Sequence, residues 1–378
     1  MNAARKIWSA GWRVAVGALL LVWIFHSIFV NEARLQAKRG ELIDHGARVI
    51  WTDTQEPPRQ EQWRLGWKYG PPALWETLRS VNVASLGISF LIMGSTLLIG
   101  VARWRMVLRV QGLELSYSRA LEISLVAHFF NSFLLGTAGG DVMKAYCAAR
   151  ETHHKKTEAV VTVFVDRVLG LWAMLLFAAI MIVPNLSLFR ESKLRTAGVL
   201  IVAMTIAASG FVFLAFRGGV SNAWSGARHW LRRLPKGDWL ERSLDSCRKF
   251  GQQRGFVARA LALSMLLNLL CVLQFFVLAR GLPGAGVSFL ALCFVVPTVI
   301  CISAAPISPS GLGVRENLFV NLLAVSAIGV AATPALSLSL LAYAGSLFWS
   351  LVGGIVYATF KHKHHMTKEE LRVEEAES

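Results

Sequence analysis

Residues 131–144 place an acid and a base beside a glycine-rich break within an apolar stretch. Gly139 and Gly140 are followed at once by Asp141, and Lys144 lies three residues further on. Glycine permits a sharp change of backbone direction, and the free N–H groups of a helix that begins after such a break attract an anionic group. Because charges are expensive in lipid, the segment predicts an anion-binding site or an internal ion pair.

A simpler interpretation of the same residues stays open. Asp141 as a helix cap paired with Lys144 at i, i+3 spacing would need no ligand. Asn131 and His128 lie on the apolar run before the break, where each could be a buried polar group whose hydrogen bonds are met within the protein. We keep Asn131 as a candidate ligand and favour the structural role for His128.

A second break at residues 306–317, PISPSGLGVREN, has the same composition. Its prolines stop the preceding helix, and Gly311 and Gly313 make the turn. Arg315 and Glu316 then open the next helix. Two breaks that each carry an acid and a base at a helix start indicate a binding site more strongly than either break alone.

Asp166 and Arg167 form a third charged position, near the inner end of an apolar run at 159–183. A long arginine side chain can extend to the membrane surface, but an aspartate in lipid gains nothing unless it is paired. We therefore expect Asp141 or Asp166 to lie close to Lys144 or Arg315.

The elements that must position these residues are membrane spans of about 20 apolar residues. The predicted spans are 12–30, 82–101, 159–183, 196–216, 258–280 and 334–360. Two further apolar regions, 119–150 and 287–332, are interrupted by glycine, proline and charge. The predicted fold class is all-α: a polytopic membrane protein with about six full spans plus two re-entrant helical hairpins.

The distribution of charge predicts the topology. Segment 217–257 holds nine Lys and Arg against three acids, so it is expected in the cytoplasm together with both termini. Segment 31–80 is balanced, with eight cations and seven acids, and is expected in the periplasm. Each interrupted region must then begin and end on one side. The halves 82–183 and 258–360 therefore predict an inverted repeat, an arrangement typical of transporters.

Three parts of the chain follow from this topology. We expect an N-terminal anchor helix and periplasmic loop at 1–81, a membrane domain at 82–360 and a polar cytoplasmic tail at 361–378. The tryptophans of the loop are expected at the outer membrane surface, where tryptophan is enriched. They are Trp51, Trp63, Trp67 and Trp75.

Composition excludes several classes of protein. The chain has 378 residues, of which 54% are hydrophobic and 16% charged, which is too little charge for a soluble protein of this length. We attribute the net charge of +16 to anionic lipid headgroups and topology and expect no nucleic-acid partner. Five cysteines without paired spacing predict neither a disulfide framework nor a metal site. The sequence contains no Walker motif, and no cofactor is expected.

Four stretches together resemble the membrane domain of the lysylphosphatidylglycerol synthase family, a flippase-like domain also found in the multiple peptide resistance factor. They are RWRMVLRVQGLELSYSRA at 103–120, NSFLLGTAGGDVMKAY at 131–146, VDRVLGL at 165–171 and PISPSGLGVRE at 306–316. The resemblance covers roughly 82–360 and implies a multi-pass protein of the bacterial inner membrane that moves or handles a lipid. The residues that match by motif position are Asn131, Gly139, Gly140, Asp141, Asp166, Arg167, Gly311, Gly313, Arg315 and Glu316.

Two positions depart from the family pattern. Leu135-Gly136 stands where the family usually has Pro-Gly, and Lys144 stands where it usually has Arg. Lysine is a point charge that cannot grip a phosphate bidentately, which puts the headgroup preference in doubt. The synthases also carry an aminoacyltransferase domain, which we expect to be missing because 18 residues follow the last predicted span.

The function we expect is transport of an anionic or aminoacylated phospholipid or glycolipid between leaflets, without catalytic residues. Lys144 and Arg315 would hold the phosphate, while Asp141, Asp166 and Glu316 would pair with these cations or bind an amino headgroup. Two alternatives stay open: a membrane-embedded transferase that acts on a lipid-linked substrate, and a non-catalytic scaffold. A homo-oligomer or a partner lipid-modifying enzyme is also left open.

Overall fold

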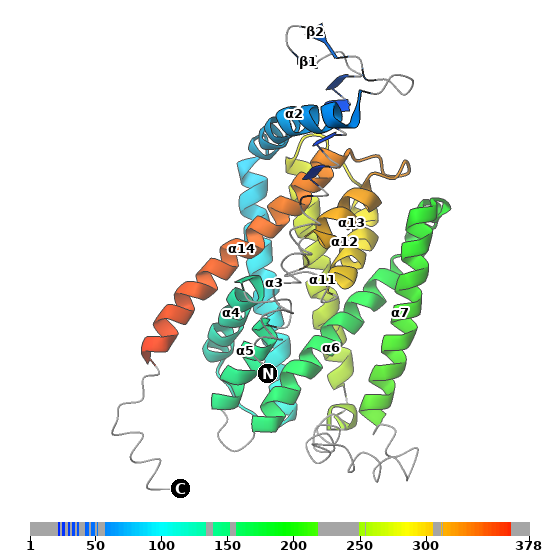
Figure 1. The fold of residues 1–378 in the computed structure, drawn as a ribbon. Coiled ribbons are helices and arrows are strands. Elements are labelled where there is room, and N and C mark those ends of the chain that lie inside the picture. Colours follow the sequence, from blue (N-terminus) through cyan, green and yellow to red (C-terminus); the bar gives the residue numbers. More distant parts are fainter. Residues whose placement is uncertain are drawn as a thin grey trace, which may run out of the picture.

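The computed structural model describes residues 57–133, 139–151, 156–217, 249–253, 255–304, 311 and 313–363, with short pieces between 22 and 51. This part of the chain is all-α apart from one small hairpin (Figure 1). Five helices are long and apolar enough to cross a membrane, and they agree with five of the predicted spans. They are α3 (Val83–Val110), α6 (Lys156–Ile180), α7 (Ser192–Arg217), α11 (Phe256–Gly281) and α14 (Ala332–Lys363).

Some predicted elements lie outside the described residues. They include most of the predicted span 12–30, residues 218–248 of the basic segment, and residues 364–378 of the tail. The tips of the two predicted hairpins, 134–138 and 305–310, also lie outside the described residues.

Helices α3 and α11 pack antiparallel and form the centre of the bundle (Figure 1). Asn82 begins α3, because its side chain accepts a hydrogen bond from the N–H of Ala84 at 2.9 Å, while its own N–H donates to the carbonyl of Gly281 at 2.8 Å. A Cβ at Gly281 would lie 2.4 Å from the side chain of Ser85, so glycine allows this close approach. The pair holds two walls of the candidate site.

Two pairs of short helices lie at opposite ends of the bundle (Figure 1). One pair is α4 (Tyr117–Phe133) with α5 (Gly139–Glu151), and the other is α12 (Phe289–Ser303) with α13 (Val314–Leu323). These helices have 10 to 17 residues, which is shorter than the ~20 residues that a full span needs. Helix α14 packs against α4 and α13, and α6 packs against α12 and α5.

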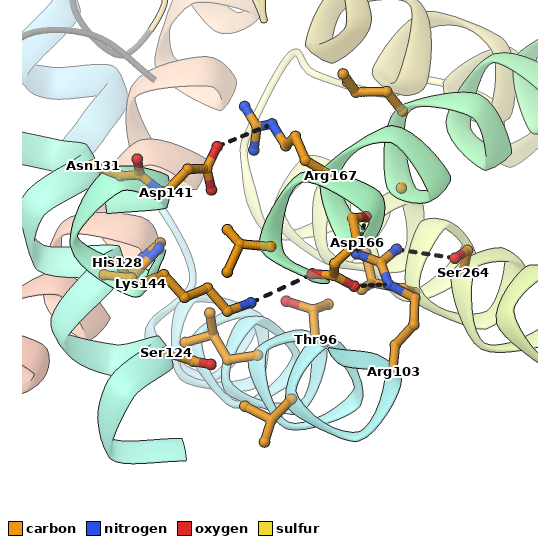
Figure 2. Close-up of a pocket in the computed structure, with 18 of the residues that line it drawn as sticks. Thr96, Arg103, Ser124, His128, Asn131, Asp141, Lys144, Asp166, Arg167 and Ser264 are labelled. Atoms are coloured by element: carbon orange, nitrogen blue, oxygen red, sulfur yellow. Dashed lines mark hydrogen bonds and ion pairs between the residues drawn. The ribbon is translucent and has the colours of Figure 1, made fainter. Parts of the chain in front are cut away.

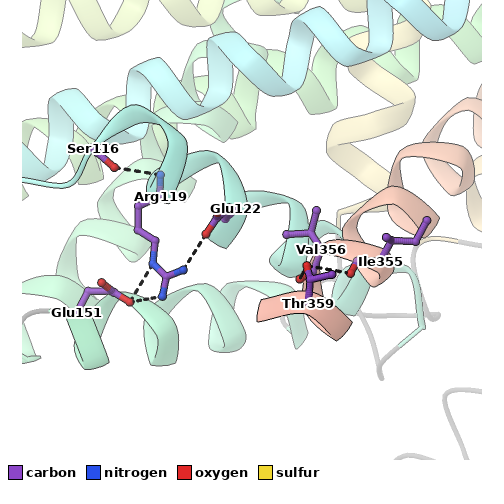
Figure 3. Close-up of polar contacts among 7 residues, drawn as sticks. All are labelled: Ser116, Arg119, Glu122, Glu151, Ile355, Val356 and Thr359. Carbon is purple, nitrogen blue, oxygen red and sulfur yellow. Dashed lines mark hydrogen bonds and ion pairs between the residues drawn. The ribbon is translucent and has the colours of Figure 1, made fainter. Parts of the chain in front are cut away.

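A cluster of three charged side chains connects the two helices of the first pair, α4 and α5 (Figure 3). The guanidinium of Arg119, near the start of α4, lies 2.7 Å from Glu122 and 2.6 Å from Glu151, the last residue of α5. Arginine presents several donors in a fixed plane, so a single side chain can hold two carboxylates. The cluster therefore holds the last turn of α5 against the first turn of α4.

The segment before α3 contains a helix where the sequence predicted only a loop. Helix α2 (Arg59–Arg79) lies crosswise over one end of the bundle, beside a hairpin of β1 (Ile43–Asp44) and β2 (Ala47–Arg48) (Figure 1). Its tryptophans, Trp63, Trp67 and Trp75, are exposed, as a place at the membrane surface requires. Trp51 is only 2% exposed and packs in a small cluster with Leu42 and Leu65, so its predicted surface position is wrong.

Candidate functional site

A cavity of about 310 Å³ lies between α3, α4, α5, α6, α11 and the end of α12 (Figure 2). The side chains that line it include five of the residues predicted from sequence: Asn131, Asp141, Lys144, Asp166 and Arg167. Segments far apart in the chain supply them, which is why only the fold can bring them together.

Asp166 is the centre of the charged cluster. One of its carboxylate oxygens lies 2.8 Å from Nε of Arg103, and the other lies 3.4 Å from Nζ of Lys144. Arg103 also donates to the hydroxyl of Ser264 at 2.9 Å. All three charged side chains are 10–12% exposed. Buried charges of this kind persist because they are paired and hydrogen-bonded.

Small neighbours make room for this cluster. A Cβ at Gly170, one turn after Asp166 on α6, would lie 3.0 Å from two nitrogens of Arg103. Lys144 lies over the ring of Trp104 at 4.1 Å, and the indole is fully buried. The face of an indole attracts a cation, so Lys144 is held by a carboxylate on one side and a ring on the other.

A second ion pair lies closer to the outside of the cavity. Nε of Arg167 lies 3.5 Å from the carboxylate of Asp141. These side chains are 40% and 31% exposed, against 10–12% for the inner cluster. Asp141 is in the first turn of α5, where the partial positive end of the helix favours a carboxylate. The ion pairs of Asp141 and Lys144 therefore both reach across to α6.

Gly140, in the first break, allows close packing of α4 and α5. The N–H of Gly140 donates to the side-chain oxygen of Asn131 at 2.9 Å, and a Cβ at Gly140 would lie 2.1 Å from the carbonyl oxygen of Ala127. Gly139 and Gly140 are helical residues that begin α5. Asn131 thus ties the end of α4 to the start of α5, while its side chain also faces the cavity.

The second break is a turn, as predicted, but its charges are paired with each other. Gly311 and Gly313 have positive φ angles of 70° and 81°, a conformation that favours glycine. Glu316 is fully buried and accepts a hydrogen bond from the N–H of Gly313 at 2.7 Å and another from Nε of Arg315 at 3.0 Å. The guanidinium of Arg315 also lies 4.4 Å from the ring centre of Tyr343.

The two breaks therefore contribute unequally to the cavity. Among the described residues, the second hairpin lines it only with Ile300 and Ala304, at the end of α12. We expected Asp141 or Asp166 to lie close to Lys144 or Arg315, and Asp166 lies close to Lys144, whereas Arg315 is paired with Glu316.

Sequence reasoning missed several residues of the cavity wall, among them Arg103, Ser264 and Asn268. The predicted span 82–101 ends before Arg103, but α3 continues to Val110 and buries Arg103 to 9% exposure. The apolar residues Val107, Leu108 and Val110 were the available signal that the helix extends past the arginine. The polar residues of α11 carried no comparable signal.

The fold and the site define a polytopic α-helical membrane protein with a charged internal cavity. A sequence model of the family described as the lysylphosphatidylglycerol synthase TM region matches residues 62–353, and the chain belongs to this family. A search of curated proteins finds no match. Membership gives the protein a membrane function related to lipid. Within the described part of the chain, no cluster of three or more His, Cys, Asp or Glu could hold a metal ion.

Proposed function

We propose that the protein moves a lipid between membrane leaflets and binds the headgroup in the cavity between α3, α5, α6 and α11. The observation that carries this proposal is the set of three cations and two carboxylates gathered inside a bundle of long apolar helices. Intramembrane ionisable residues are costly and mark substrate pathways. The two more exposed residues, Asp141 and Arg167, would meet the headgroup first.

The packing supports an inverted repeat of 82–183 and 258–360. In this repeat α3, α4, α5 and α6 correspond to α11, α12, α13 and α14, and α3 and α11 pack antiparallel. The contact of α4 with α14 corresponds to that of α12 with α6. The contact of α5 with α6 corresponds to that of α13 with α14. Exchanging the first half for the second thus preserves the set of neighbours. In such repeats, short helices enter from opposite sides as re-entrant hairpins and the substrate binds between the halves.

The location we propose is the bacterial inner membrane, with both termini in the cytoplasm and α2 on the periplasmic surface. The exposed tryptophans of α2 and the positive segment 217–257 support this orientation. A membrane phospholipid or glycolipid is the partner that this arrangement favours.

The cations have distinct roles in this proposal. Arg103 would stay on Asp166 as a fixed support, because it holds both that carboxylate and Ser264. Lys144 makes a longer contact of 3.4 Å with Asp166 and would turn its ammonium to the phosphate. Arg167 would add a second contact. Arg315, paired with Glu316, would position the second hairpin and would not hold the phosphate.

The test is leaflet exchange of labelled lipids in liposomes that contain the purified protein. We expect exchange well above protein-free vesicles, and at least a tenfold loss in Lys144→Gln at equal protein content. The matched control is Lys193→Gln, at an exposed position on the first turn of α7, which should exchange like wild type. Exchange no faster than in protein-free vesicles would contradict the proposal.

A further inference from the structure

Two cations of the cavity, Lys144 and Arg167, have more N–H donors than the contacts they make. Lys144 has three N–H donors and makes one hydrogen bond, to Asp166, within the described part of the chain. Arg167 has five donors and, among the described residues, one ion-pair contact, to Asp141. Both side chains therefore have N–H donors left for a ligand that accepts hydrogen bonds.

The two carboxylates of the cavity are already paired with protein cations. Asp166 faces two cations, Arg103 and Lys144, and Asp141 faces Arg167. The ring nitrogen Nε2 of His128 lies 3.1 Å from a backbone carbonyl oxygen and so acts as a donor there. An ammonium group on a ligand would have to compete with protein cations for both carboxylates.

The net charge of the cavity also favours an anionic ligand. Arg103, Lys144 and Arg167 against Asp141 and Asp166 leave one positive charge with His128 neutral. The undescribed residues 134–138, between α4 and α5, and 305–310, after α12, carry no ionisable side chain, whereas 152–155, between α5 and α6, include His153, His154 and Lys155. A headgroup with a single negative charge balances this cavity, whereas a cationic one raises the uncompensated charge to two.

Asn268 provides an independent observation on the opposite wall. It is 3% exposed and lines the cavity from α11, and its amide nitrogen Nδ2 has no hydrogen-bond partner among the described residues. A buried donor without a partner costs the protein free energy. A hydroxyl or phosphate oxygen of a ligand would satisfy it, and an ammonium group would not.

We propose that this cavity selects a small headgroup with one negative charge, a phosphodiester bearing hydroxyl groups such as phosphoglycerol, over its aminoacylated ester. The inference rests on the proposed lipid site and names its substrate class. The volume of about 310 Å³ lies at the lower end of the ~300–1,000 Å³ range of ligand pockets, which favours a small headgroup over an oligosaccharide.

The experiment measures binding separately from transport. Purified protein in neutral detergent is titrated in native mass spectrometry with short-chain phosphatidylglycerol, its lysyl ester and soluble glycerol phosphate. We expect at least tenfold tighter binding of phosphatidylglycerol than of the lysyl ester. Glycerol phosphate should bind at least tenfold more weakly than the lipid, and equal binding would assign the site to a free phosphate ester and overturn the lipid assignment.

A variant that adds an acceptor tests the physical cause. Asn268→Asp supplies a carboxylate and cancels the surplus charge, so the preference for phosphatidylglycerol should fall at least tenfold. Asn317→Asp makes the same change on α13, where the side-chain oxygen accepts from Asn321, and should keep the wild-type preference. Asn268→Leu removes the donor without adding charge, so it should weaken the binding of phosphatidylglycerol and leave that of the lysyl ester unchanged. It serves as the test if Asn268→Asp is poorly expressed.

The outcomes separate the two proposals. Equal or tighter binding of the lysyl ester by wild-type protein overturns the inference, whatever lipid is transported. Selective binding of phosphatidylglycerol without leaflet exchange supports the inference and contradicts transport as the function.

Discussion

Arg103 holds Asp166 at two points: Nε lies 2.8 Å from the carboxylate, and Nη2 donates to the backbone carbonyl of the same residue at 3.3 Å. The side chain thereby fixes both the rotamer of Asp166 and the position of α6 against α3. The contact with Ser264 extends this to α11. One arginine therefore connects three of the long helices at the wall of the cavity.

The loss of stability on removing one member of this cluster should depend on how many partners are left unpaired. Asp166→Ala leaves two buried cations without their carboxylate and should lower stability most, by more than the ~3–5 kcal/mol of a single broken buried pair. Arg103→Ala leaves Asp166 with Lys144 and should fall near that range. Lys144→Ala should be mildest, because Asp166 keeps Arg103. The measurement is protein abundance and thermal unfolding in detergent.

The double variant Arg103→Met/Asp166→Leu tests the same reasoning. It leaves one unpaired cation instead of two, so it should be more abundant than Asp166→Ala and still fail in leaflet exchange. A loss in the double variant equal to the sum of the losses in its two single variants would show that the pair contributes no coupled energy.

Glycine-to-alanine changes should rank by what the new Cβ meets. At Gly140 it lies 2.1 Å from a backbone oxygen, which cannot move easily, so we expect low abundance and an overpacking cost of ~1–3 kcal/mol or more. At Gly170 it meets the flexible end of Arg103 at 3.0 Å, so the protein should fold but exchange lipid more slowly.

The matched control is Gly210→Ala in α7, where a Cβ has no neighbour within 4 Å. Alanine is the better helix former by roughly 0.5–1 kcal/mol, so this variant should be as stable as wild type or slightly more so. A Gly140→Ala protein with normal abundance would show that α4 and α5 do not need this close approach.

The proposed orientation predicts opposite labelling at the two ends of α3. In a background with the five native cysteines replaced, a cysteine at Ser80, exposed after α2, should react with an impermeant maleimide from the periplasm. A cysteine at Ser118, exposed near the start of α4, should react only after the membrane is permeabilised. The reverse pattern would show that the orientation is inverted. Labelling of both positions from outside would contradict the placement of the two ends of α3 on opposite sides of the membrane.

Asp44 should make the contact between the β1–β2 hairpin and α2 sensitive to acid. The hydrogen bond from Lys68 at 2.6 Å, and then those from Arg64 and Tyr69, hold the pKa of this carboxyl well below its usual range. Its contribution is therefore complete above the unfolded value of about 3.9 and is lost as pH falls through the lower folded value. Hydrogen exchange at residues 42–44 should rise across that acidic window.

The basic partner loses its contribution at the other end of the pH scale. Asp44 raises the pKa of Lys68, so the pair weakens only as pH rises past about 10.4 and through the higher folded value. Asp44→Asn should raise the exchange of residues 42–44 at neutral pH. Glu61→Gln, which removes an exposed contact of 3.8 Å to Arg64, should change little. Unchanged exchange in Asp44→Asn would contradict this assignment.

The sequence predicted the long spans well because an uncharged apolar run of about 20 residues rarely occurs outside a membrane helix. It placed the end of α3 at residue 101, since three arginines follow, whereas the helix continues to Val110. The partner that makes Arg103 tolerable in the helix is Asp166, 63 residues away. Such a long-range ion pair has no local signal, and the same reason hid Ser264 and Asn268.

Helix α2 was missed because Pro71 and Pro72 lie inside it, and proline normally ends a helix. Tertiary packing outweighs that local preference. A Cβ at Gly70 would overlap the side chain of Phe29, and one at Gly66 would lie 2.8 Å from Val30, so the N-terminal segment packs closely against this helix. In contrast, the pairing of Lys144 with Asp166 was predictable, because a buried aspartate in a span needs a cation and few were available.

The separation between Arg103 and Asp166 also sets the order of events during synthesis. At ~5–20 residues per second, the ribosome adds the intervening 63 residues in about 3–13 s, during which α3 contains an arginine without its carboxylate. A lone arginine at the centre of a membrane helix costs ~2.5–3.5 kcal/mol on insertion scales. Arg103 is the 21st of the 28 residues of α3, so its cost lies below this central value, and we expect α3 to reach its full stability in the membrane only once α6 has emerged.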